Sequence, residues 1–173
     1  ITGARYTPHM YRFSIVQAPS WSVFEDFELP VPPVGPRRFF RTALRTAPSK
    51  LIGGLAAGTQ KRIVVYGTSL TAGGAWVGQL GSWLTANYPG QTVIVNSGLS
   101  GKNSADGLAQ LQTKVLNHAP DTVFIEFATN DAFRYSDGTP SLSVEQARFN
   151  LNAMIGAILA LNPDCEVILQ TMN

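Results

Sequence analysis

Three short segments of small and polar residues follow directly after apolar runs, and they hold groups that acyl-transfer chemistry requires. They are Gly67-Thr68-Ser69-Leu70-Thr71, Asn96-Ser97-Gly98-Leu99-Ser100-Gly101 and Ala128-Thr129-Asn130-Asp131. Ser69 offers a hydroxyl nucleophile beside the start of a helix, where a developing negative charge is favoured. Gly98 leaves its backbone N–H approachable because it has no side chain, and Asn130 offers an amide donor. Each residue alone is as typical of a cap or turn, but a nucleophile with convergent donors is the arrangement that stabilises a tetrahedral oxyanion.

The apolar runs predict strands that alternate with helices, and this alternation decides where the three segments meet. Strands are expected at 62–66, 92–95, 122–127 and 166–170, and helices at 75–88, 104–117 and 144–161. Apolar strands in such an alternation predict a parallel sheet with helices on both faces. Ligands of such sheets lie beyond the carboxyl ends of the strands. The three segments, and residues 171–173 after the fourth strand, are therefore expected to converge on one rim.

Some large side chains in these elements are expected to have structural roles. The aromatic residues expected in the core, rather than in a substrate platform, are Trp76, Trp83, Phe127 and Phe149. Glu126 lies inside the third strand, and we expect it to face a polar partner rather than to act in catalysis. Ser143 is expected to cap the helix at 144–161.

The first 48 residues follow a different pattern, with many prolines and aromatic residues. Short strands are expected there at 11–17, 21–29 and 38–44. We interpret residues 1–48 as a β-rich segment, either the tail of an upstream β-domain or a flap on the main domain. Residues 49–60 are expected to form a linker, and residues 61–173 an incomplete α/β domain. The start without methionine and the end soon after the fourth strand lead us to expect a fragment.

The composition excludes several classes of protein. Apolar residues make up 45% and charged residues 14% of the chain, which suits a well-cored domain and not a disordered one. No apolar run approaches the roughly 20 residues that a membrane span needs. One cysteine excludes a multi-cysteine metal site, two histidines leave little for a histidine-based one, and we expect no metal or cofactor. Residues 1–62 carry nine basic and three acidic side chains, but their scatter among apolar residues argues against a nucleic-acid-binding arm.

The three polar segments resemble sequence blocks of the SGNH (GDSL) hydrolase family. The segment around Ser69 looks like the first block, that around Gly98 like the glycine block, and that around Asn130 like the Gly-x-Asn-Asp block. Their order and placement agree over about residues 60–173. The resemblance implies a flavodoxin-like three-layer α/β/α fold and an esterase or lipase-like activity. It also implies Ser69 as nucleophile and first oxyanion donor, with the Gly98 N–H and the Asn130 side chain as the other donors.

The chain departs from this family pattern at three places. Thr68 stands where the family most often has aspartate and Ala128 where it usually has glycine, and neither position is expected to do chemistry. The third departure is the family's Asp-x-x-His segment after the last strand, which has no counterpart here. His118 is expected on the opposite side of the sheet from Ser69, and His9 has no aspartate three residues before it. A serine needs an adjacent base, so we expect a missing C-terminal segment to supply the histidine and aspartate.

Together these features predict a serine hydrolase that cleaves carboxylic esters through an acyl-enzyme on Ser69. Short acyl esters and acetyl esters of carbohydrates are favoured as substrates, and a secreted or periplasmic location is expected. The expected partners are therefore a small-molecule or carbohydrate ester and the missing segment, with no nucleic acid and no membrane span. One alternative is a non-catalytic binding module, or an inactive fragment, on the same scaffold. Another is a flavodoxin-like nucleotide-binding or phosphate-binding domain, which the absence of a proper phosphate loop disfavours.

Overall fold

A five-stranded sheet organises the molecule, whose computed structural model describes residues 12–16 and 49–171. The strands are β1 (Arg12–Val16), β2 (Lys61–Gly67), β3 (Thr92–Asn96), β4 (Thr122–Glu126) and β5 (Glu166–Thr171). Their order across the sheet is β1-β5-β4-β2-β3. Strands β2 to β5 pair in parallel, which confirms the predicted parallel sheet, whereas β1 pairs antiparallel with β5 at one edge. The predicted strands at 21–29 and 38–44 lie outside the described residues.

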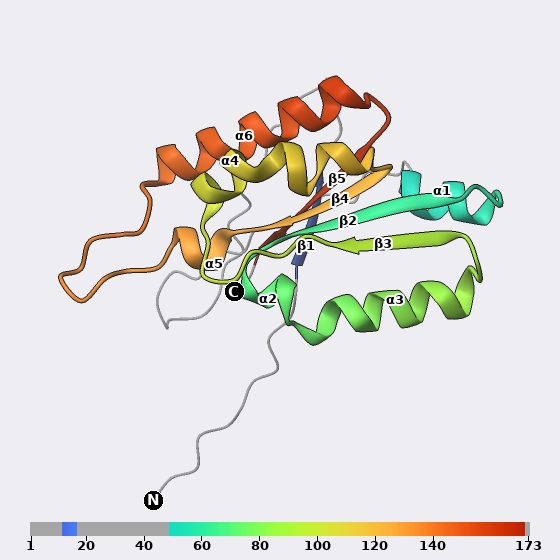
Figure 1. Ribbon diagram of the computed structural model, residues 1–173, viewed down its shortest axis with the longest axis horizontal. Coiled ribbons are helices and arrows are strands. Elements are labelled where there is room, and N and C mark those ends of the chain that lie inside the picture. Colours follow the sequence, from blue (N-terminus) through green and yellow to red (C-terminus); the bar gives the residue numbers. More distant parts are fainter. Residues whose placement is uncertain (1–11, 17–48, 172–173) are drawn as a thin grey trace, which may run out of the picture.

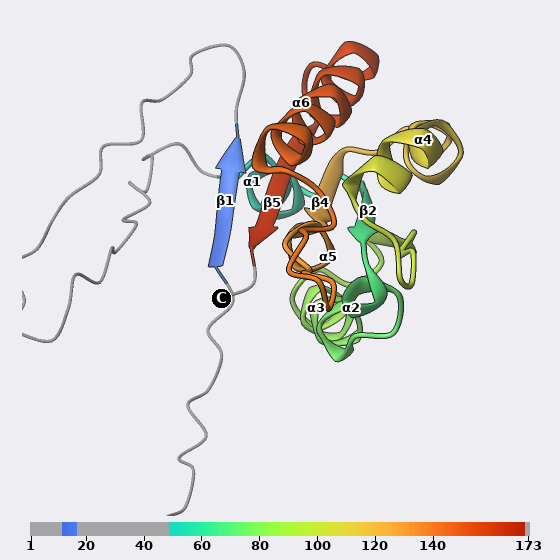
Figure 2. The same ribbon diagram turned by 90° about the vertical axis from the view of Figure 1, so that its left-hand side faces the viewer.

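Helices cover both faces of the sheet and produce the expected three layers (Figures 1 and 2). On one face lie α4 (Ser104–Lys114) and α6 (Val144–Leu161), and on the other lie α1 (Lys50–Ala56) and α3 (Ala75–Asn87). Alternate residues of β2 serve the two layers, because successive side chains of a strand point to opposite faces. Val64 and Tyr66 pack with α4 and α6, whereas Ile63 and Val65 pack with α1 and α3.

The helix boundaries follow from local capping chemistry. The Ser143 hydroxyl accepts a hydrogen bond from the Gln146 N–H at 3.1 Å, which confirms the predicted cap of α6. Helix α4 ends at Lys114, three residues earlier than predicted, and a 3₁₀ turn, η1 (Leu116–His118), follows it. Ala119 then adopts a left-handed φ of 46°, immediately before Pro120, where the proline ring disfavours helical backbone.

Two predictions from the sequence were wrong in part. The linker expected at 49–60 contains helix α1, whose Leu51 and Leu55 are buried against the sheet. Its short length and two adjacent glycines kept the helical signal weak. Trp83 and Phe149 were expected in the core, but their exposed fractions are 50% and 64%, whereas Phe127 is buried as predicted. No helix in the described part of the chain is long and apolar enough to cross a membrane.

Candidate active site

The three polar segments meet at the carboxyl ends of the parallel strands. Helix α2 (Ser69–Ala72) follows β2, and helix α5 (Ala128–Asp131) follows β4, at the same end of the sheet in Figure 1. Gly98, from the loop after β3, lies directly on α2, because a Cβ built there would fall 2.2 Å from the Ala72 nitrogen. The Asn130 side chain reaches the same loop, where its Nδ2 donates to the Lys102 carbonyl at 2.8 Å. The expected convergence of the segments is therefore confirmed.

The turn between β2 and α2 leaves Ser69 uncommitted. Thr68 caps α2: its hydroxyl accepts a hydrogen bond from the Leu70 N–H at 3.2 Å, and its carbonyl accepts from the next two amides of the helix. The Thr68 hydroxyl also donates to Glu126 Oε2 at 2.7 Å. Ser69 is exposed, and neither its N–H nor its Oγ has a hydrogen-bond partner among the described residues. Within the described part of the chain, both groups are therefore available to hydrogen-bond a ligand.

The other two predicted donors are partly engaged within the protein. The Gly98 N–H donates to Asn96 Oδ1 at 3.0 Å, and Asn96 Nδ2 donates to the Thr71 carbonyl of α2 at 3.0 Å. Asn130 donates one of its two amide protons to the Lys102 carbonyl, and the second has no acceptor among the described residues. Asn96 was not singled out from the sequence, although an asparagine two residues before a glycine is a typical turn former. It holds the Gly98 loop against α2.

Two buried carboxyl groups lie behind this rim. Glu126 is 1% exposed, and burial raises its pKa above the ordinary value, while hydrogen bonds from Thr68 oppose the shift and the nearby Asp131 adds to it. Asp131 accepts a hydrogen bond from the Ser104 N–H at 2.7 Å, and burial raises its pKa as well. The expected polar partner of Glu126 is therefore Thr68. The two groups join α2, β4, α4 and α5 at the site.

No histidine of the described residues lies near Ser69. His118 precedes β4, at the amino end of the strands, where its carbonyl accepts a hydrogen bond from Arg62 Nη1 at 2.9 Å. This confirms the prediction that it lies on the opposite side of the sheet. His9 lies outside the described residues, as do residues 172 and 173 of the fourth rim segment. Within residues 49–171, no cluster of three His, Cys, Asp or Glu side chains could hold a metal ion.

An ordered hairpin next to Asn130 exposes two aromatic rings. The Tyr135 N–H donates to the Thr139 carbonyl at 2.9 Å, and the Ser141 N–H donates to the Phe133 carbonyl at 2.7 Å. The rings of Phe133 and Tyr135 meet edge to face, with centroids 5.4 Å apart, and are 56% and 55% exposed. This aromatic pair offers an apolar surface three residues beyond Asn130. It was not predicted from the sequence, where its only signal is two aromatic residues before a glycine-containing turn.

Comparisons with known proteins agree with this architecture. The chain is 33% identical over 109 residues to an arylesterase of Vibrio mimicus, covering 60% of this chain and 51% of that protein. It is 33% identical over 96 residues to an uncharacterised lipoprotein of Bacillus subtilis, covering 51% of this chain and 40% of the lipoprotein. The chain thus spans about half the length of the curated relatives that it matches, or less.

Solved structures share the same fold. A lipase/acylhydrolase from Enterococcus faecalis matches with a TM-score of 0.52 and 30% identity, over 62% of this chain and 55% of that one. An acetylxylan esterase from Geobacillus stearothermophilus matches with a TM-score of 0.54 and 22% identity, over 60% of this chain and 56% of that one. Residues 65–173, which hold all three rim segments, match the GDSL-like Lipase/Acylhydrolase family. This protein belongs to that family.

Proposed function

We propose that the protein hydrolyses carboxylic esters through an acyl-enzyme on Ser69. The observation that carries the proposal is that Ser69 is exposed at the carboxyl end of β2, and that neither its hydroxyl nor its backbone N–H has a hydrogen-bond partner among the described residues. In the first step, Ser69 Oγ forms a bond to the ester carbonyl carbon as its proton passes to a base. The tetrahedral intermediate collapses, and the alcohol leaves with that proton. Water then attacks the acyl carbon and gives a proton to the same base. The second tetrahedral intermediate releases the carboxylic acid, and the base returns the proton to Ser69 Oγ.

Three donors would stabilise the oxyanion of this intermediate. The Ser69 N–H is available as it stands, and Asn130 contributes its second amide proton. The Gly98 N–H is the third donor, and it would turn from Asn96 Oδ1 toward the oxyanion or be shared between them. Removing one such donor from a serine hydrolase typically costs about 100-fold to 1,000-fold in kcat.

The base that activates Ser69 would be a histidine outside the described residues. Of the two histidines in the sequence, His118 is at the far end of the sheet, and His9 lacks the aspartate spacing of the family. We therefore assign the histidine and its aspartate to the C-terminal segment expected from the family resemblance. A histidine base would give a rise in kcat/KM with pH that follows the loss of the imidazolium proton, near a pKa of about 6.5.

Short acyl groups on a carbohydrate or aryl alcohol are the proposed substrates. The solved acetylxylan esterase and the curated arylesterase support this class, because their names describe an acetylated sugar polymer and an aryl ester. The exposed Phe133 and Tyr135 rings support it too, since aromatic rings pack against the apolar faces of sugars and against aryl groups. The lipoprotein relative supports a location outside the cytoplasm, secreted or periplasmic.

Labelling with a fluorophosphonate tests the proposed nucleophile. The full-length protein is treated with the probe, its intact mass is measured, and the modified residue is mapped by digestion. We expect one adduct on Ser69, none in Ser69→Ala, and a loss of ester hydrolysis of at least about 1,000-fold in that variant. Ser100→Ala is the matched control, because Ser100 is an exposed serine of the neighbouring rim segment. A folded protein that takes no adduct would favour the non-catalytic binding module instead.

A further inference from the structure

We propose that Thr68, held by Glu126, is a positioning residue for the nucleophile, and that it acts without touching the substrate. The inference deepens the proposed function and rests on it. Thr68 and Glu126 are 0% and 1% exposed, so neither side chain can reach a bound ester directly. Their hydrogen-bonded pair lies directly before Ser69 in the chain and beneath the turn that carries it.

The geometry of the pair fixes the Thr68 hydroxyl against the start of α2, where the Ser69 N–H is the first amide of the helix. Thr68 donates three hydrogen bonds to Glu126. Its hydroxyl donates to Oε2 at 2.7 Å, and its N–H donates to the Glu126 carbonyl at 3.1 Å and to Oε2 at 3.2 Å. With its proton directed at Glu126, the Thr68 hydroxyl oxygen faces the Leu70 N–H and accepts from it. The Thr68 carbonyl takes the next two amides, so only the Ser69 N–H of α2 lacks an acceptor among the described residues.

Helix α2 has little apolar packing to hold it in place by other means. It has four residues, and its only buried residue is Thr71, which is polar. Helix α1, by contrast, buries Leu51 and Leu55 against the sheet. A turn without an apolar anchor depends on its polar contacts, so loss of the Thr68 hydroxyl should let Ser69 shift relative to Gly98 and Asn130. Misplacement of reacting groups by about 1 Å can reduce the rate by as much as about 100-fold.

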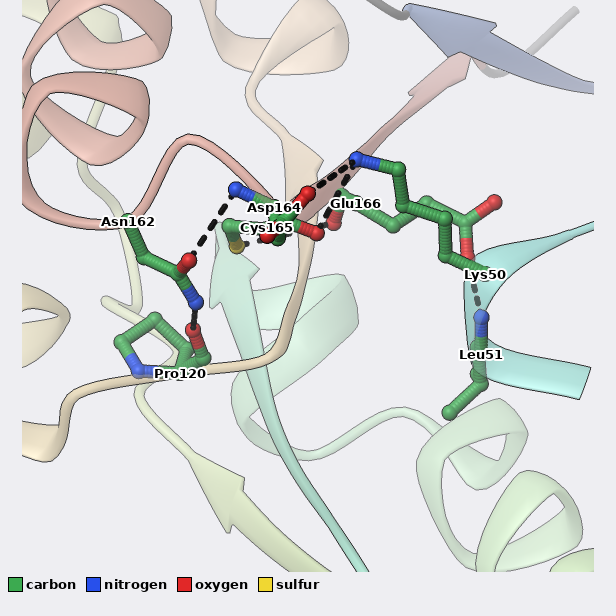
Figure 3. A network of polar contacts seen from close by, with 7 residues as sticks. All are labelled: Lys50, Leu51, Pro120, Asn162, Asp164, Cys165 and Glu166. Carbon is green, nitrogen blue, oxygen red and sulfur yellow. Dashed lines mark hydrogen bonds and ion pairs between the residues drawn. The ribbon is translucent and has the colours of Figure 1, made fainter. Parts of the chain in front are cut away.

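The far end of the same sheet provides a matched pair that has no nucleophile beside it. Ser49 caps α1, accepts a hydrogen bond from the Ile52 N–H, and donates to Glu166 Oε2 at 2.8 Å. The Leu51 N–H donates to the same Glu166 oxygen at 2.8 Å, a contact drawn in Figure 3. Glu166 is also 1% exposed. The two pairs therefore share their chemistry and a buried carboxyl group, although Ser49 is only partly buried, and they differ in what the capped turn carries.

The experiment compares hydroxyl deletions at the two caps in the full-length protein. Thr68→Val keeps the shape of the side chain but removes the hydroxyl, Thr68→Ser keeps the hydroxyl, and Ser49→Ala is the control. The readouts are the fluorophosphonate labelling rate, kcat and KM for p-nitrophenyl acetate, and the melting temperature. We expect Thr68→Val to lower the labelling rate and kcat by about tenfold or more with little change in KM. Thr68→Ser should restore both rates, and Ser49→Ala should lower the melting temperature without slowing either rate.

Other results would overturn the inference. Equal rates in folded Thr68→Val and in the wild-type protein would do so, as would a Thr68→Ser variant as slow as Thr68→Val. Amide hydrogen exchange provides a readout that needs no activity: the Leu70 N–H should exchange faster in Thr68→Val, and the Ile52 N–H faster in Ser49→Ala. If the wild-type protein takes no adduct at Ser69, the proposed function fails, and unchanged exchange at Leu70 would separately refute the positioning role.

Discussion

A methyl group added at Gly98 should impair catalysis far more than it impairs folding. The Cβ of Gly98→Ala would lie 2.2 Å from the nitrogen, 2.5 Å from the Cα and 2.8 Å from the Cβ of Ala72. Two of these atoms are backbone of α2, so no flexible side chain can move aside. The cost is steric, because Gly98 does not adopt a left-handed φ that only glycine tolerates.

The expected loss of stability and of kcat follows from how far the Gly98 loop and α2 must move apart. Non-bonded carbon and nitrogen atoms prefer a separation of roughly 3.5 Å, so the Gly98 loop and α2 must move apart by about 1 Å. Overpacking of this kind typically costs about 1–3 kcal/mol of stability. The same displacement separates the Gly98 N–H from Ser69, and a 1 Å misplacement of groups at a reaction centre can lower kcat by about 100-fold.

The assay pairs ester hydrolysis with urea unfolding for Gly98→Ala and a control glycine. Gly78 is the fourth residue of α3 and is exposed, and a methyl group added there would have no neighbour within 4 Å. Gly78→Ala should leave kcat unchanged and stabilise the protein by roughly 0.5–1 kcal/mol, since alanine is the better helix former. A Gly98→Ala variant that unfolds at lower urea but keeps the wild-type kcat would refute the link between this close contact and catalysis.

Three further outcomes are expected. Alanine at Phe133 or Tyr135 should raise KM for aryl and sugar acetates with little change in kcat, whereas alanine at Phe149 on α6, another exposed aromatic residue, should change neither. Equal KM values in all three variants would show that the aromatic pair does not bind substrate. Asp131→Asn should gain stability relative to the wild type as the pH rises above the ordinary carboxyl pKa of 3.8, because burial raises the pKa of Asp131 and its ionised form then destabilises the native state. Urea unfolding at about pH 4 and pH 7 measures this, and a difference that is independent of pH would contradict it. Burial raises the pKa of Cys165 to about 12, so a thiol reagent at about pH 8 should modify the unfolded protein and spare the native one.

The parallel sheet could be predicted because its signals are local and strong. Each central strand is a run of β-branched and apolar residues, and the helices between them carry caps such as Ser143 that can be read from a few positions. Helix α1 could not be predicted, because its start is held by hydrogen bonds to Glu166, a residue more than 100 positions away. Trp83 and Phe149 show the opposite limit, since residue type predicts burial without stating which face of a helix meets the core.

The candidate site was predictable as a location, but the state of its donors was not. Strand ends in a parallel sheet must share a rim, so the convergence of the segments that carry Ser69, Gly98 and Asn130 follows from topology. Which N–H is free depends on hydrogen bonds between residues distant in sequence, such as Thr68 with Glu126 and Asn130 with Lys102. The residue types indicate that a hydrogen-bond donor is present. Only the three-dimensional structure shows whether that donor is already bonded to another acceptor. The Ser69 N–H, which has no partner among the described residues, is free because it is the first amide of α2, and the carboxyl group of Glu126 on the neighbouring strand holds the residue that caps this helix.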